Sequence, residues 1–433
     1  MNRRHFLAGS VAAAGSGARF GISADAGRSQ SLHAGFWGTQ YYGDAERDQL
    51  NEVLITQSPF RWYGKVQPMK VATFEKEFAE RMRTQHVLAV TSGTAALQCA
   101  VNALEIGPGD EVILPAWTWH SCYSAIVLAG GLPVFAEIDE SFNIDPSDIE
   151  HRITPQTKAM MAVHLQGSPA DLDRILPIAR KHKLRVIEDC AQSLGASYKG
   201  RPVGSIGDIG IYSLQLNKTI TAGEGGAVAT NDPVLFERAA RFHDLGALRP
   251  LHQRILGEER LSPFAGSNFR MSEFTGSVLL AQLRKLDRII NDVHSNAQRV
   301  YQGISDLPGI QFRRLPDPAG QLGSGVYIDF KTKERRDRFI DLMKAEKISA
   351  SSPTGSAILP IQPYIENKAT VHAAWPTFNS DRGKAIRYGA ASCPRTIDIL
   401  GRFGGVLMDP KFSGRDTDDI VAAIRKVYPK VVA

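Results

Sequence analysis

Lys218 is the residue of this sequence that most directly suggests covalent chemistry. It follows an apolar run that ends near Ser213 and precedes a glycine-rich turn at residues 223–226 (GEGG). A lysine amine in such a place forms a Schiff base with a carbonyl when its surroundings lower its pKa. Most lone lysines are solvated surface residues, so this pattern alone leaves both interpretations open.

An acidic segment and a glycine-containing turn are two further candidates. Asp189 lies in the run 188–192 (EDCAQ), at the carboxyl end of an apolar segment, where ligands bind in open α/β sheets. A carboxylate there can hold a cationic ring nitrogen, although acids in loops are common. The turn 91–94 (TSGT) separates an expected strand from an expected helix, whose N–H groups can bind phosphate. An ordinary capped turn would have the same sequence.

The run 266–273 (GSNFRMSE) is the fourth candidate. Asn268 and Arg270 offer donors for an anion, while Ser272 is a natural helix cap with a purely structural explanation. None of the four segments identifies a reaction by itself.

Strands and helices alternate around these segments. This order predicts βαβ units and a mainly parallel sheet, which is an α/β fold. The expected strands are 86–90, 111–114, 133–136, 159–163, 184–187, 209–212, 227–230 and 326–330, and the expected helices are 73–83, 94–104, 120–128, 171–182, one long helix over 272–300, 335–346 and 417–427.

Composition is that of an ordinary globular protein. The chain has 433 residues, of which 43% are hydrophobic and 22% charged, with a net charge of +6. The thinly spread basic residues form no nucleic-acid track, and no stretch after the N-terminus is apolar enough to span a membrane. The cysteines form no CxxC pair and no histidine cluster accompanies them, so neither a metal site nor a disulfide framework is expected; they are Cys99, Cys122, Cys190 and Cys393.

Three regions are expected along the chain. Residues 1–26 contain Arg3 and Arg4, then an Ala/Gly-rich stretch and Ala24-Asp25-Ala26, which is the layout of a twin-arginine signal peptide. Export to the periplasm is therefore expected, the alternative being an N-terminal tail on a cytoplasmic protein. A large domain is expected over 27–285 and a smaller C-terminal α/β domain over 286–433. The loop-rich stretch 351–382 is expected to line a binding site.

Taken together, the motifs resemble one family. The order SGT at 92–94, PAWTW at 115–119, EDCAQ at 188–192, Ser213 five residues before Lys218, GEGG and GSNFRMSE is similar to the DegT/DnrJ/EryC1/StrS aminotransferases. The resemblance extends from about Asp44 to the C-terminal helix. It implies the fold of aspartate aminotransferase (fold type I), with pyridoxal 5'-phosphate (PLP) as the cofactor.

The resemblance also implies roles for individual residues. Lys218 is expected to be the Schiff-base lysine, and Asp189 is expected to pair with the pyridine nitrogen. The other implied cofactor contacts are Gln192 to the ring hydroxyl, Trp119 on the ring face, Gly93, Thr94 and Ser213 at the phosphate, and Asn268 at the phosphate of a neighbouring subunit. A homodimer with shared active sites follows from the last contact.

The implied reaction is ping-pong transamination. Glutamate or glutamine is the expected donor, and a ketosugar or keto-cyclitol is the expected acceptor. Some relatives are dehydratases in which histidine replaces the lysine, and Lys218 argues against that branch. A PLP-binding sensor or scaffold without turnover is the second alternative, and the intact set of Asp189, Lys218 and Asn268 argues against it.

Overall fold

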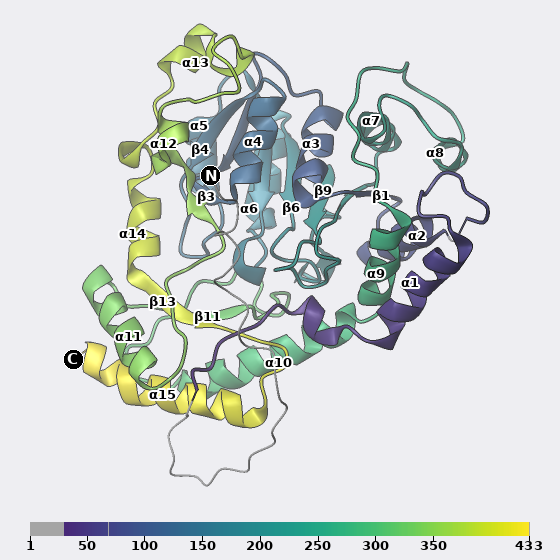
Figure 1. Ribbon diagram of the computed structural model, residues 1–433. Helices are drawn as coiled ribbons and strands as arrows, with labels where there is room; N and C mark the ends of the chain where they lie inside the picture. Colours follow the sequence, from purple (N-terminus) through teal and green to yellow (C-terminus); the bar gives the residue numbers. More distant parts are fainter. Residues whose placement is uncertain (1–29, 68, 433) are drawn as a thin grey trace, which may run out of the picture.

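A seven-stranded sheet forms the centre of the molecule, seen here in a computed structural model that describes residues 30–67 and 69–432 (Figure 1). The strands lie in the order β1-β10-β9-β6-β5-β2-β4. All neighbours from β4 to β9 are parallel, whereas β10 is antiparallel to both β9 and β1. The bounds are β1 His86–Val90, β2 Glu111–Pro115, β4 Leu132–Ala136, β5 Thr157–Val163, β6 Arg185–Asp189, β9 Ile209–Ser213 and β10 Gly226–Thr230. The predicted α/β class with a mainly parallel sheet is confirmed.

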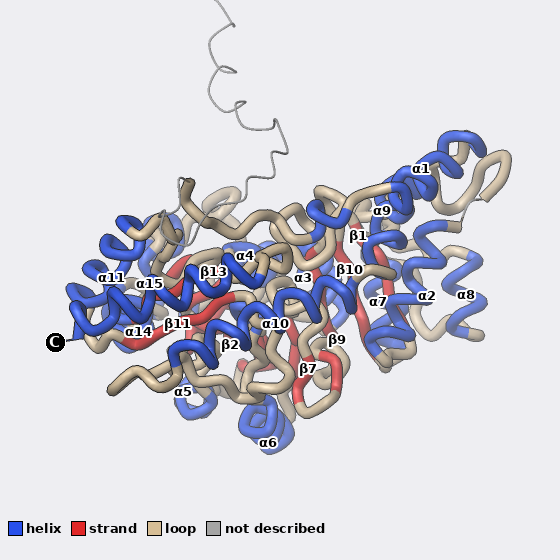
Figure 2. The backbone as a smooth tube through the Cα atoms, turned by 90° about the horizontal axis from the view of Figure 1, so that it is seen from below, coloured by secondary structure: helices blue, strands red, loops and turns tan. Residues whose placement is uncertain are grey.

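The strands are apolar because the sheet is covered on both faces. Successive side chains of a strand point to opposite faces. Accordingly, Leu88 and Val90 of β1 join one core cluster, and Val87 and Ala89 join the other. The first cluster includes side chains from α3 (Gly93–Ala103), α4 (His120–Leu128) and α7 (Pro233–His243), and the second from α2 (Lys70–Met82) and α6 (Leu172–His182). Figure 2 shows α4 and α6 on opposite sides of the strands.

A second, smaller core lies at the bottom of Figure 1. Strands β11 (Gly325–Asp329) and β13 (Phe403–Leu407) form an antiparallel pair. Helices α10 (Leu286–Ile304), α11 (Lys333–Ala345) and α15 (Gly414–Val432) pack with this pair around their own buried residues. The domain boundary at 285/286 stays a prediction.

The prediction of a single long helix over 272–300 is wrong. The chain forms α9 (Glu273–Leu283) and α10, with a break at Arg284 and Lys285. Both side chains turn toward acids of the neighbouring helices: Arg284 pairs with Glu77 of α2, and Lys285 Nζ lies 2.6 Å from Glu46 Oε1 of α1 (Asp44–Thr56). Helix α9 is buried on several sides, whereas α10 buries a single stripe, so the two helices fit different surroundings.

Residues 351–382, expected to be loops, contain short elements that pack on the large sheet's core and reach the top of Figure 1. The other expected elements are found within a few residues of their predicted ends. The remaining bounds are η1 Gly38–Tyr41, β3 Trp117–Thr118, α5 Pro146–Arg152, η2 Leu165–Gly167, β7 Ser197–Tyr198, β8 Arg201–Pro202, α8 Pro250–Leu256, β12 Ala357–Ile358, η3 Leu359–Ile361, α12 Pro363–Glu366, η4 Pro376–Phe378, α13 Asp381–Ala385, η5 Ala390–Ser392 and α14 Pro394–Arg402.

Candidate active site

A cavity of about 630 Å³ opens at the carboxyl ends of β1, β6 and β9. This is the end of an open α/β sheet at which ligands bind. Seven of the eight predicted site residues line it, although they come from segments far apart in the chain: Gly93, Thr94, Trp119, Asp189, Gln192, Ser213 and Lys218.

The N-terminus of α3 forms one wall of the cavity. Ser92 caps the helix by accepting a hydrogen bond from the N–H of Ala95 (3.1 Å). Within the described chain, the N–H groups of Gly93 and Thr94 find no acceptor, as expected for the first turn of a helix. A Cβ atom on Gly93 would lie 2.6 Å from Cβ of Ser213, so only glycine permits this close approach. Two free N–H groups beside a serine hydroxyl fit the phosphate of PLP.

Asp189 lies on the floor of the cavity at the end of β6. Its Oδ1 accepts a hydrogen bond from the N–H of Ala191 (2.9 Å), and its Oδ2 accepts one from Sγ of Cys122 (3.1 Å). Burial raises the pKa of the Asp189 carboxyl, because removal from water disfavours the charged form. A cationic ring nitrogen would offset that cost, so the site fits a pyridinium. Cys122 was not predicted here, because its contact with Asp189 spans 67 residues.

Lys218 reaches the same cavity from the turn after β9. The turn is closed by a hydrogen bond from the N–H of Lys218 to the carbonyl of Gln215 (2.9 Å). Burial lowers the pKa of the Lys218 amine, and the charge of Asp189 acts in the opposite direction. A lysine with a lowered pKa presents more of the neutral amine, which is the nucleophilic form.

Gln192 and Trp119 frame the opening. The Gln192 amide nitrogen donates to the carbonyl of Gly355 (3.1 Å) and to the hydroxyl of Ser356 (2.9 Å), so the stretch 351–382 does reach the site. Trp119 immediately precedes α4, and 54% of it is exposed. Such exposure leaves its ring available to a ligand in the cavity.

Asn268 lies outside this cavity, on the surface. Its segment is held by hydrogen bonds from the N–H of Phe269 to the carbonyl of His243 (2.8 Å) and from the N–H of Thr91 to the carbonyl of Phe269 (3.0 Å). Buried Asp244 pairs with Arg270 of the same segment. The segment is thus well supported, and the role of Asn268 in a neighbouring subunit stays a prediction.

Gln166 is a lining residue that no motif indicated. It adopts a φ of 52°, a sparsely populated value for a residue other than glycine. Its N–H donates to Oε1 of Gln192 (3.1 Å), and its own Oε1 accepts a hydrogen bond from the Tyr327 hydroxyl (2.8 Å). Gln166 therefore links Tyr327 of β11 to Gln192, which is predicted to contact the cofactor.

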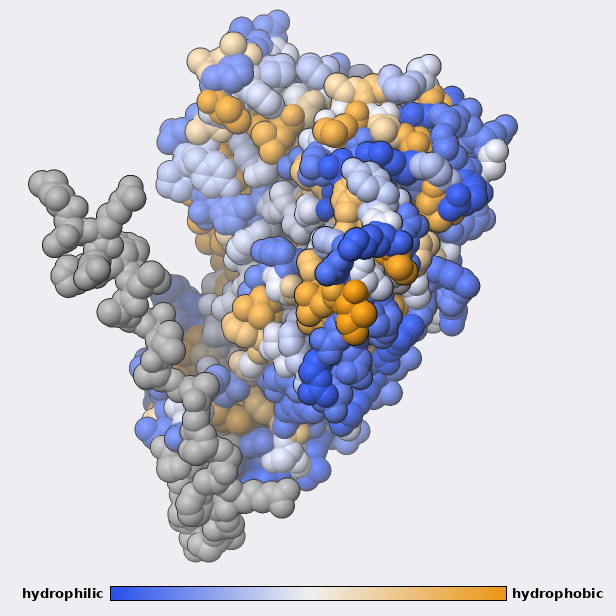
Figure 3. Space-filling view, turned by 45° about the vertical axis from the view of Figure 1, so that its right-hand side comes forward, coloured by the Kyte–Doolittle hydropathy of each residue, from blue (hydrophilic) through white to orange (hydrophobic). Residues whose placement is uncertain are grey.

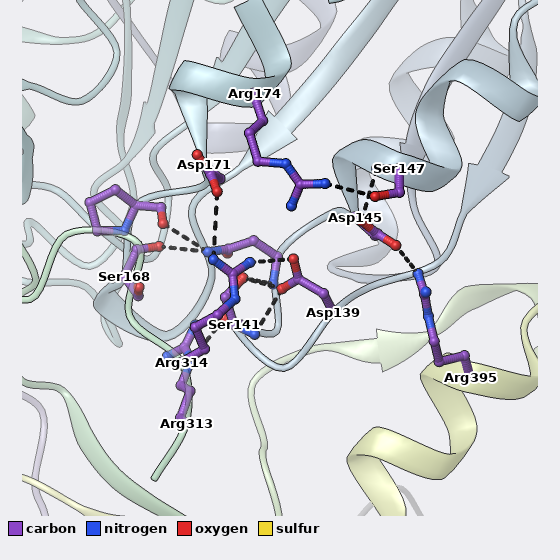
Figure 4. A network of polar contacts seen from close by, with 12 residues as sticks. Asp139, Ser141, Asp145, Ser147, Ser168, Asp171, Arg174, Arg313, Arg314 and Arg395 are labelled. Atoms are coloured by element: carbon purple, nitrogen blue, oxygen red, sulfur yellow. Dashed lines mark hydrogen bonds and ion pairs between the residues drawn. The ribbon is translucent and has the colours of Figure 1, made fainter.

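Arg313, which Figure 4 shows beside Ser141, supports the loop that carries Gln166. Its guanidinium is buried and donates to three carbonyls: Ser141 (2.8 Å from Nε), Leu165 (2.7 Å from NH2) and Gln166 (3.0 Å from NH1). Burial lowers the pKa of Arg313 to about 10. No carboxylate among the described residues lies within ion-pair distance of it, so backbone carbonyls balance the charge.

The segment that leads into α1 forms another wall that the sequence did not indicate, residues 34–37. The N–H of Gly35 donates to Oδ2 of Asp409 (2.6 Å), and the indole N–H of Trp37 donates to the carbonyl of Met408 (3.1 Å). Contacts with the two residues that follow shortly after β13 thus fix the position of this wall.

Comparison with known proteins identifies the family. The profile of the DegT/DnrJ/EryC1/StrS aminotransferase family matches residues 45–379. The chain belongs to that family. It is therefore an aminotransferase, and the family's members depend on PLP.

Named relatives and a solved structure agree with this assignment. GDP-perosamine synthase of Escherichia coli O157:H7 is 40% identical over 263 residues, which are 60% of this chain and 69% of that protein. L-Glutamine:2-deoxy-scyllo-inosose aminotransferase of Streptomyces kanamyceticus is 42% identical over 61% of this chain and 63% of its own length, which is under two thirds. An aminotransferase structure from Psychrobacter cryohalolentis superposes with a TM-score of 0.76 at 29% identity, covering 90% of this chain and 98% of its own.

Among the residues that the structure describes, no helix has the length and apolarity needed to cross a membrane.

Proposed function

We propose that this aminotransferase uses PLP to move an amino group from glutamate or glutamine to a ketosugar or keto-cyclitol. The observation that carries the proposal is one cavity in which Lys218, Asp189 and the N-terminus of α3 meet. The names of the two relatives, one a sugar-nucleotide enzyme and one a cyclitol enzyme, support this acceptor class.

Each wall of the cavity has a part in this reaction. When bound, PLP supplies an electron sink for the charge left as the donor loses its α-proton. Asp189 would hold the ring nitrogen in its protonated form, and Gly93, Thr94 and Ser213 would bind the phosphate. Trp119 would stack on the ring, and Gln192 would reach the ring hydroxyl.

Lys218 would attach the cofactor and move the protons. Once the donor displaces it, its free amine takes the proton from the donor's α-carbon, and later delivers a proton to the carbon of the acceptor that receives nitrogen. Over the full cycle the donor becomes a keto acid and the acceptor becomes an amine. The two half-reactions balance, so no other oxidant or reductant is required.

A donor and acceptor screen tests the substrate class. Cofactor-loaded enzyme is incubated with glutamate or glutamine and with a nucleotide-linked 4-ketosugar or a free keto-cyclitol, and products are read by mass spectrometry. We expect a product in which C=O has become CH–NH2, absent in Lys218→Ala. Loss of water from the sugar without a gain of nitrogen would instead identify the dehydratase branch. The variant to compare in that case is Lys218→His, because histidine replaces the lysine in those dehydratases.

A homodimer with shared active sites is part of the proposal. Two observations support it: Asn268 lies on the surface on a braced segment, and several large apolar side chains are exposed, including Leu54, Ile55, Tyr63 and Leu245. Figure 3 shows apolar patches in orange on the face turned to the viewer. Patches of this kind mark interaction surfaces.

Subunit mixing tests the shared site. If Asn268 serves the partner's cofactor, a hybrid of Lys218→Ala and Asn268→Ala subunits contains one fully intact site. Activity should then return when the two poorly active variants are refolded together. A mixture no more active than its components would contradict the shared site.

Export by the twin-arginine route is a separate proposal, based on residues 1–26, which lie outside the described residues. Arg3→Lys with Arg4→Lys should shift the protein from the periplasmic to the cytoplasmic fraction. An unchanged distribution would leave the N-terminus as a tail without a targeting role.

A further inference from the structure

A second cavity, of about 380 Å³, lies beside β4 at the edge of the sheet. It shares no lining residue with the active-site cavity. Its walls are β4, the end of α5 and the segment 382–392, which includes most of α13 (Asp381–Ala385). It is thus a cavity separate from the active site, beside the seven-stranded sheet.

The lining contains three arginines and a histidine but no carboxylate: Arg152, Arg382, Arg387 and His151. Arg382 uses only Nε to reach Glu111 (2.7 Å), and Arg152 uses only Nε to reach Asp148 (3.0 Å). Their terminal nitrogens donate to no described residue. Both guanidinium groups therefore keep their two terminal nitrogens, NH1 and NH2, available to a ligand.

Arg387 has no carboxylate partner in the described part of the chain. Its NH1 donates to the carbonyls of Lys384 (2.5 Å), Ala385 (3.0 Å) and Ile386 (3.1 Å), while Nε and NH2 make no such contact. The neighbouring Lys368 has a lowered pKa, chiefly because it is partly removed from water and then because Arg387 repels its charge. Positive charge is therefore in excess here, and an anion would relieve the repulsion.

An aromatic wall gives the cavity a fixed shape. The rings of Phe135 and Tyr388 meet edge to face, with centroids 5.3 Å apart. The Tyr388 hydroxyl donates to the carbonyl of Pro133 (2.7 Å), which ties the segment 382–392 to β4. The arginines thus project from a braced frame, which lowers the entropic cost of binding a ligand.

We propose that this cavity is a binding site for a small phosphorylated molecule, distinct from the active site. The free nitrogens of Arg152, Arg382 and Arg387 would bind phosphoryl oxygens, for which guanidinium groups have matching donor geometry. The volume exceeds that needed for a bare phosphate, and the aromatic wall can contact the remainder of the ligand.

Calorimetric titration of the cofactor-loaded enzyme with inorganic pyrophosphate tests this proposal. We expect saturable binding, weakened about tenfold or more in Arg387→Gln and in Arg152→Gln, since each loses a charged donor. Lys384→Gln is the matched control: it removes the same charge from an exposed residue of α13 that does not line the cavity, and should change the Kd by less than about twofold.

Three results would overturn the proposal. The first is the absence of saturable binding to the unaltered enzyme. The second is equal binding by Arg387→Gln, Arg152→Gln and Lys384→Gln, which would place pyrophosphate at the active site or in a diffuse counter-ion layer. The third is equal affinity for succinate, which would remove the preference for phosphoryl groups. Unchanged circular dichroism of each variant confirms that binding, and not folding, is compared.

Discussion

Arg313→Met should destabilise the protein strongly for a single substitution. The guanidinium of Arg313 makes four hydrogen bonds to three carbonyls and is only 3% exposed. Methionine keeps much of the side-chain volume but leaves the carbonyls of Ser141 and Leu165 in the interior without this donor. An unsatisfied buried polar group costs about 1–3 kcal/mol, and removal of a buried cation recovers part of its desolvation cost. We expect a net loss of about 3 kcal/mol.

Arg314→Met is the matched control, one residue away. The Arg314 side chain is 40% exposed and pairs with Asp139 and with Asp171 (3.5 Å). Water screens the Arg314 end of these pairs, although Asp139 and Asp171 are largely buried, so their loss should cost about 1 kcal/mol. The two substitutions remove the same charge from neighbouring positions, and they differ in burial and in hydrogen-bond partners.

Urea denaturation of both variants and the unaltered protein, followed by circular dichroism, gives the comparison. The shift in midpoint multiplied by the m-value yields the change in the free energy of unfolding, provided that the m-values agree. If Arg313→Met cost no more than Arg314→Met, the carbonyl contacts would not be stabilising the interior as we argue.

Three further predictions concern the cavity. Asp189→Asn should still bind PLP but should slow the donor-driven loss of its visible band at least about a hundredfold in stopped-flow absorbance, because the ring nitrogen loses its charged partner. Gly93→Ala should weaken PLP binding in equilibrium dialysis, because the new Cβ would lie 2.6 Å from Cβ of Ser213; unchanged affinity would contradict the tight fit. The pKa of Lys218 is lowered from 10.5, so the unfolded chain binds more protons between the folded-state value and 10.5. Cofactor-free protein should therefore gain stability with rising pH in that window relative to Lys218→Met, by up to about 1.4 kcal/mol per pH unit, and parallel curves would contradict the shift.

Most strands and the segments that bear the site could be predicted, because their signals are local. The strand at 86–90 is an apolar run of four residues after His86, and Ser92 caps the helix that follows it. Lys218 and Asp189 each belong to a short motif that marks the end of a strand. These patterns depend on a few neighbouring residues, and tertiary contacts do not override them.

The rest depends on contacts between distant parts of the chain. Arg313 reaches Gln166 across 147 residues, and Gly35 reaches Asp409 across 374. The break between α9 and α10 depends on where Glu46 and Glu77 lie in the folded chain. No local pattern encodes any of these positions, so the supports of the site emerge only from the fold.

The visible spectrum of the purified protein, with and without an amino donor, tests the central claim most directly. We predict that PLP bound through Lys218 gives a band that glutamate or glutamine removes, and that Lys218→Ala does not give this band. A band that persists with every donor would favour a protein that binds PLP without turnover. No band even after PLP is added would contradict the assignment of the cavity.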